Sequence, residues 1–95
     1  MKVVMYTTPI CPYCVRAKAL LDNKSIEVEE RDITTDPKLF NEMLERSGGR
    51  KTVPQIFIGD YHVGGSDDLY QLEKSGEFTL VIRQQRSKSD RTAKP

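Results

Sequence analysis

The feature that most constrains this chain is a pair of cysteines, Cys11 and Cys14, at the start of a segment with helical spacing. A strand-like apolar run and a short loop precede them. The first turn of a helix has N–H groups without backbone partners, and their partial positive charge stabilises a thiolate, the reactive form of cysteine. Pro12 suits the first helical position, where its missing N–H has no role. The pattern therefore predicts an asymmetric redox pair, in which Cys11 attacks and Cys14, one turn further in, resolves.

A zinc site is the main alternative for two cysteines at this spacing. Structural zinc needs four ligands, and the chain has only two cysteines and one histidine, His62. Those residues cannot form a closed nitrogen and sulfur site within one chain. Redox chemistry is therefore the better interpretation, no metal is expected, and His62 is expected to be structural rather than catalytic.

Length and composition indicate one small domain. The chain has 95 residues, of which 37% are hydrophobic and 31% charged. No apolar run approaches the about 20 residues that a membrane span requires, and strand-like sequence begins too early to leave room for a leader peptide. Two cysteines in such a chain are typical of a reducing compartment, so we expect a cytoplasmic protein. We also expect it to be a monomer. Basic residues do not gather with aromatic ones on the folded part, which argues against nucleic-acid binding.

The periodicity predicts the order β-α-β-α-β-β-α. Proline and glycine mark several of the boundaries. Strands are expected at residues 2–6, 26–29, 54–58 and 61–63, helices at residues 12–24, 37–47 and 66–75, and a last short helix at residues 78–82. The second strand alternates apolar and polar residues and is therefore expected at an edge of the sheet.

The end of the chain has a different composition. Residues 83–95 contain five basic side chains, one acidic one and almost nothing apolar to bury. We therefore expect a folded domain at residues 1–82 followed by a mobile basic tail at residues 83–95.

Three short segments together resemble the signatures of a dithiol glutaredoxin, in particular the bacterial glutaredoxin-3 type. They are Cys11-Pro12-Tyr13-Cys14, Thr52-Val53-Pro54 and residues 64–69, and the resemblance extends over residues 2–75. It implies a thioredoxin-like α/β fold, a small four-stranded mixed sheet with helices on both faces. It also implies a thiol–disulfide oxidoreductase that uses glutathione as co-substrate and reduces glutathione mixed disulfides and protein disulfides.

The resemblance also implies a role for the residues before the third strand. In such proteins the proline at the position of Pro54 is cis, which would leave the backbone of Val53 facing Cys11, open to an added strand of substrate. Thr52, Val53 and Pro54 would then bind glutathione, and Tyr13 would pack on it. The alternative is a proline that simply begins a strand.

A second part of the expected glutathione site lies at the start of the third helix. The N–H groups of Ser66 and Asp67 would bind the carboxylate of the γ-glutamyl group, and the Asp67 side chain would bind its ammonium. The alternative is a plain helix cap, which serine and aspartate often form without a ligand.

One position departs from the family pattern. Many glutaredoxins have a lysine, implicated in holding the glycine carboxylate of glutathione, where this chain has Thr8. Arg50, Lys51 and Asn41 are the alternatives, and the sequence does not choose among them.

Other functions remain open at this point. One is a redoxin reduced by thioredoxin reductase instead of glutathione. Another is an iron–sulfur carrier that binds a 2Fe–2S cluster between two protomers, which Pro12 disfavours in this family. The last is a binding module whose basic tail supplies the function.

Overall fold

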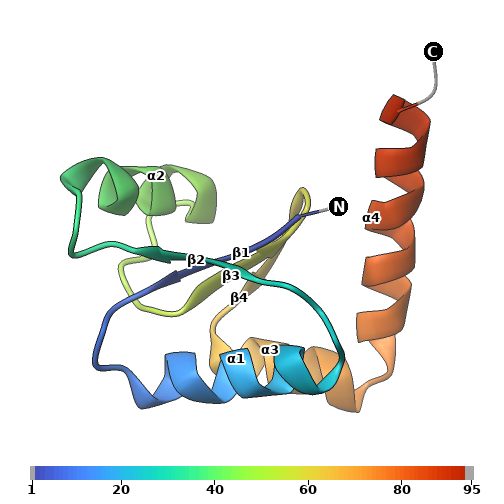
Figure 1. Cartoon of the computed structure of the whole chain (residues 1–95), viewed down its shortest axis with the longest axis horizontal. Coiled ribbons are helices and arrows are strands. Elements are labelled where there is room, and N and C mark those ends of the chain that lie inside the picture. Colours follow the sequence, from blue (N-terminus) through green and yellow to red (C-terminus); the bar gives the residue numbers. More distant parts are fainter. Residues whose placement is uncertain (1, 94–95) are drawn as a thin grey trace.

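The computed structural model describes residues 2–93. They form one four-stranded sheet and four helices (Figure 1). The strands are β1 (Val3–Thr7), β2 (Glu29–Asp32), β3 (Gln55–Ile58) and β4 (Tyr61–Gly64). The helices are α1 (Pro12–Asn23), α2 (Pro37–Ser47), α3 (Ser66–Lys74) and α4 (Glu77–Ala93).

The sheet has the strand order β2-β1-β3-β4. β1 pairs with β2 in parallel and with β3 antiparallel, and β3 and β4 form an antiparallel hairpin. All five residues of β1 are buried, as expected for a central strand covered on both faces. Helices α1 and α3 lie on one face and α2 on the other (Figure 1). The predicted four-stranded mixed sheet with helices on both faces is confirmed.

Each face of the sheet has its own apolar core. The larger core joins the sheet to α1, α3 and α4, and fully buried Met5, Leu21, Ile56 and Leu69 are among its members. The smaller core lies beneath α2 and consists of Val4, Tyr6, Met43 and Phe57. Alternate residues of β1 thus point to opposite helical layers, as the two-residue period of a strand requires.

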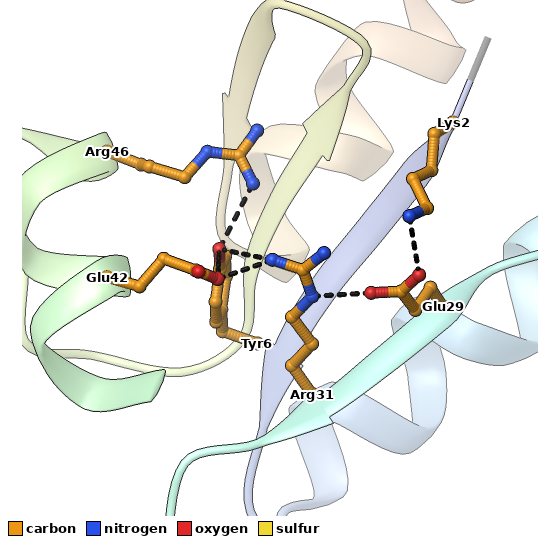
Figure 2. Close-up of polar contacts among 6 residues, drawn as sticks. All are labelled: Lys2, Tyr6, Glu29, Arg31, Glu42 and Arg46. Carbon is orange, nitrogen blue, oxygen red and sulfur yellow. Dashed lines mark hydrogen bonds and ion pairs between the residues drawn. The ribbon is translucent and has the colours of Figure 1, made fainter. Parts of the chain in front are cut away.

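Tyr6, fully buried in β1, connects α2 to the sheet (Figure 2). Its hydroxyl donates to the Glu42 carboxylate of α2 and accepts from Arg46 of the same helix, 3.0 Å away. It also accepts from Arg31 of β2 at 3.2 Å, and Arg31 in turn contacts Glu29. These contacts anchor α2, whose end leads into the loop that carries Thr52.

The ends of α2 follow the sequence signals. Asp36 caps the start, with its Oδ1 accepting the Lys38 N–H at 2.9 Å, and Pro37 occupies the first helical position. Gly48 ends the helix with φ of 73°, a left-handed conformation that glycine adopts without steric cost.

The second strand lies three residues later than predicted, at Glu29–Asp32 instead of residues 26–29. The Ile26 N–H bonds to the Leu21 carbonyl at the end of α1, so the chain is still attached to the helix there. The segment up to Val28 therefore runs from the end of α1 to the sheet before pairing with β1 begins at Glu29. The expected edge position is confirmed.

The predicted boundary at residue 82 also differs from the structure, because α4 continues to Ala93. Gln85 is buried, and its Oε1 accepts the Asp60 N–H at 3.1 Å in the β3–β4 turn. Phe78, Val81, Ile82 and Gln85 share one face at helical spacing, so the buried stripe ends in a polar residue. Residues 94–95 of the expected tail lie outside the described residues.

Candidate active site

Cys11 occupies the N-cap of α1, as the sequence predicts. Its backbone is extended (φ −148°, ψ 103°), Pro12 follows at the first helical position, and Cys11 Sγ accepts the Cys14 N–H at 3.3 Å. The sulfur therefore interacts with an N–H group of the first helical turn, which stabilises negative charge on it.

Cys14 differs from Cys11 in its surroundings. Both thiols are free, and Cys14 is 4% exposed against 9% for Cys11. Burial, followed by the hydrogen bond with Cys11, raises the pKa of Cys14 to about 11. Cys14 thus keeps its proton at neutral pH, which suits a thiol that acts second.

This difference predicts the pH dependence of alkylation. With the free protein and iodoacetamide at pH 7, we expect more label on Cys11 than on Cys14, because the thiolate is the reactive form and the raised pKa of Cys14 keeps that thiol protonated. In Cys11→Ser, labelling of Cys14 should increase only as the pH rises toward the pKa of about 11. Peptide mapping by mass spectrometry measures both sites, and rapid labelling of Cys14 at pH 7 would contradict the assignment.

The loop between α2 and β3 contacts the first cysteine. The Val53–Pro54 peptide bond is cis, as expected from the resemblance. The Cys11 thiol lies 3.9 Å from the Val53 carbonyl oxygen, at the distance of a weak sulfur hydrogen bond. Ser47 stabilises the start of this loop, since its Oγ accepts the Arg50 N–H at 3.0 Å.

Two residues that the sequence analysis did not assign to the site support this loop from behind. Gln55 is fully buried, and its Nε2 donates to the carbonyl and hydroxyl oxygens of Thr52 at 3.0 and 3.2 Å. Because Nε2 faces Thr52, the Gln55 Oε1 faces His62 Nε2, 2.7 Å away. An amide oxygen can only accept a hydrogen bond, so His62 Nε2 is the donor. Burial, then the positive charge of Arg50, lowers the pKa of His62 and favours this neutral ring. The expected structural role of His62 is thus to position the Thr52 loop through Gln55.

A cleft of about 260 Å³ brings the other predicted site residues together. The loop between α2 and β3 forms one side, the start of α3 another, and Tyr13 of α1 a third. Its lining residues are Tyr13, Arg50, Thr52, Val53, Pro54, Gly65, Ser66, Asp67 and Asp68. Tyr13 is 55% exposed and borders the cleft, with the Arg16 guanidinium over its ring, 6.0 Å from the ring centre.

The cap of α3 leaves Asp67 available. Gly65 is the N-cap, and the Asp68 carboxylate accepts its N–H at 2.9 Å, so neither Ser66 nor Asp67 caps the helix. Within the described part of the chain, the exposed Asp67 side chain makes no hydrogen bond or ion pair. The plain-cap alternative therefore does not account for Asp67.

Of the three residues considered in place of a lysine at Thr8, Arg50 lines this cleft. Its guanidinium lies 3.7 Å from the carboxylate of Asp68, another lining residue. Lys51 and Asn41 are exposed and do not line the cleft, and Thr8 borders a different one.

Among residues 2–87, whose side chains the structure describes, no three histidine, cysteine or carboxylate groups are close enough together to hold a metal ion. Over residues 2–93, no helix has the length and apolar character to cross a membrane.

Comparison with known proteins agrees with this geometry. The model of the glutaredoxin family matches residues 3–63. The chain belongs to the glutaredoxin family. This glutaredoxin is 51% identical to Glutaredoxin 3 of Escherichia coli over 81 residues, which cover 85% of this chain and 96% of that protein.

Solved structures confirm the thioredoxin-like fold. The solution structure of a glutaredoxin from Brucella melitensis superposes with a TM-score of 0.74 at 55% identity, covering 86% of this chain and 88% of the other. A buckwheat glutaredoxin–glutathione complex superposes with a TM-score of 0.76 at 25% identity, covering 86% and 76%. The glutaredoxin family supports thiol–disulfide oxidoreductase activity for this chain.

Proposed function

We propose that this glutaredoxin uses glutathione to reduce glutathione mixed disulfides and protein disulfides, with Cys11 as nucleophile and Cys14 as resolving thiol. The cleft carries this proposal, because it gathers Tyr13 and Asp67 with the Thr52–Pro54 loop, whose Val53 carbonyl lies beside the Cys11 sulfur. The glutathione complex of the buckwheat relative supports the choice of ligand.

Glutathione has groups that match the cleft. Its γ-glutamyl end carries a carboxylate and an ammonium, which suit the N–H groups at the start of α3 and the Asp67 carboxylate. The Val53 backbone is placed to pair with the extended cysteinyl part. Arg50, which lines the cleft, would bind the glycine carboxylate in this chain, which has Thr8 instead of the family's lysine.

The first reaction needs one protein thiol. The Cys11 thiolate attacks the glutathionyl sulfur of a mixed disulfide, and the substrate leaves as a thiolate that takes up a proton. A second glutathione thiolate then attacks the sulfur of the bound glutathione. Oxidised glutathione leaves, and the Cys11 thiolate is restored.

Reduction of a protein disulfide also needs Cys14. Cys11 attacks one substrate sulfur and forms a mixed disulfide with it, and the substrate disulfide breaks so that its other sulfur leaves as a thiolate. Cys14 then loses its proton and attacks the Cys11 sulfur, which releases the second substrate thiolate and forms a Cys11–Cys14 disulfide. Two glutathione molecules reduce this disulfide and leave as oxidised glutathione. The high pKa of Cys14 means that its proton is available to the departing substrate thiolate.

A coupled assay tests the proposal. The full chain, a small glutathione mixed disulfide, glutathione, glutathione reductase and NADPH should give steady NADPH consumption. Turnover that requires thioredoxin reductase instead would identify the other kind of redoxin. No turnover with either reductant would reject the proposal, and a visible absorption spectrum after anaerobic cluster reconstitution would then test the iron–sulfur carrier.

Asp67→Ala should raise KM for the glutathione mixed disulfide about tenfold while kcat changes little. The contact is remote from the reacting sulfur, so it stabilises bound substrate and transition state alike. Glu45→Ala is the matched control, because Glu45 is an exposed acidic residue on α2 outside the cleft. Wild-type constants for Asp67→Ala would place the γ-glutamyl group elsewhere.

A further inference from the structure

A second cleft borders the cysteine pair. It has a volume of about 510 Å³ and lies between α1, β2 and the loop that follows β1. Its lining residues are Thr7, Thr8, Pro9, Cys11, Cys14, Val15, Lys18, Ala19, Asp22, Glu30 and Asp32. It shares no lining residue with the cleft formed by Tyr13, Asp67 and the Thr52 loop.

A protein disulfide needs space that glutathione does not. The cysteine of a protein substrate continues into polypeptide on both sides, and the part that does not pair with Val53 needs space of its own. The second cleft contains both cysteines, so it offers a path for the other side. Its wall includes Pro9, Ala19 and Val15, whose side chain is 67% exposed, which gives a peptide apolar surface to cover.

The charged residues that line this cleft determine which ligands it can bind. Three carboxylates, Asp22, Glu30 and Asp32, line it with one ammonium, Lys18. Lys18 is already paired with Asp22 at 3.0 Å. Asp32 accepts the N–H and hydroxyl of Thr34 at 2.9 and 2.6 Å.

Glu30 is the carboxylate that these local contacts leave available. Its side chain is exposed and has no hydrogen bond or ion pair within the described part of the chain, although it lies close enough to Lys18 to interact with it electrostatically. A cleft with this excess of negative charge repels the two carboxylates of glutathione and attracts a cation. The two clefts thus differ in charge, because the first cleft contains the cation Arg50.

We propose that this second cleft binds the segment of a protein disulfide substrate that carries a lysine or arginine close to the reducible cysteine. The basic side chain pairs with Glu30 while Cys11 attacks the substrate sulfur. This inference rests on the proposed function, and it adds a class of protein substrate, namely disulfides with basic flanking residues.

Two synthetic peptides test the inference. Each has one intramolecular disulfide, and they differ only in a lysine or a glutamate two residues from one cysteine. The wild-type protein should reduce the lysine peptide with kcat/KM about twofold to fivefold higher, the effect expected of an exposed ion pair. The preference should shrink as salt is added.

Variants of Glu30 test whether this residue causes the preference for the lysine peptide. Glu30→Gln should remove most of the preference, Glu30→Lys should reverse it, and the control Glu45→Gln should keep it. Equal kcat/KM for the two peptides in the wild type, or an unchanged preference in Glu30→Lys, would overturn the inference. Faster turnover of a small glutathione mixed disulfide by Glu30→Lys would show that the cleft takes glutathione, and would also overturn it.

The same assays separate this inference from the function on which it rests. If the wild-type protein turns over the small glutathione mixed disulfide but does not discriminate between the peptides, only the second cleft is misassigned. If it turns over neither kind of substrate, the proposed function itself fails.

Discussion

Cys11→Ser should lower turnover of both glutathione mixed disulfides and protein disulfides by about 10³-fold or more. A serine hydroxyl is not ionised at neutral pH, and Cys14 cannot replace the missing nucleophile because its pKa of about 11 keeps it protonated. The fold should survive, since serine is among the best N-cap residues and its Oγ can accept the Cys14 N–H as the Cys11 sulfur does.

Cys14→Ser should separate the two activities. A second glutathione clears the mixed disulfide between Cys11 and glutathione without another protein thiol, so most of this activity should remain. A mixed disulfide with a protein is resolved by the neighbouring thiol at high effective concentration. Its reduction should fall by about 10²-fold or more when that thiol is absent.

Measuring both substrates with both variants decides the assignment, and melting temperatures control for folding. The serine at position 14 has hydrogen-bonding groups of Thr7 and Thr8 beside it, so the buried hydroxyl can be satisfied. Equal losses from the two substitutions on both substrates would mean that the cysteines are interchangeable. That result would overturn the roles of attacking and resolving thiol.

The parts of the site predicted from the sequence depend on local backbone chemistry. Cys11 and Pro12 define the start of α1 because both residue types have strong positional preferences at a helix N-terminus. The glycines at positions 64 and 65 and the acidic residues after them likewise place a helix start where α3 begins. The family resemblance adds the cis Val53–Pro54 bond, which no local pattern establishes by itself.

The parts that were missed depend on contacts between distant residues. Nothing in the neighbours of Gln55 shows that its amide joins Thr52 to His62 across the hairpin. The acidic lining of the second cleft is similar, since Asp22 and Glu30 belong to different elements and meet only when β2 pairs beside α1. The polar composition of residues 83–95 gave no sign that Gln85 is buried, because Gln85 is a polar residue that follows the apolar residues on the same face of α4.

Gln85 leads to a prediction about truncation. A chain ending at Ile82 should lose about 1–3 kcal/mol of unfolding free energy relative to the full chain. Gln85 is buried against the β3–β4 turn, where its Oε1 accepts the Asp60 N–H and lies where a side chain on Gly59 would be. The truncation also moves Val81 and Ile82, both buried, to the fraying end of the helix.

The melting temperature should accordingly fall by roughly 4–24 °C for a domain of this size. A chain ending at Ser87 is the matched control, because it keeps Gln85 and the buried stripe of α4. In the full chain, Gln85→Ala should reproduce part of the loss, which separates the side chain from the length of the helix. If the chain ending at Ile82 has the same melting temperature as the full chain, residues 83–87 contribute nothing to the fold, and the domain ends at residue 82.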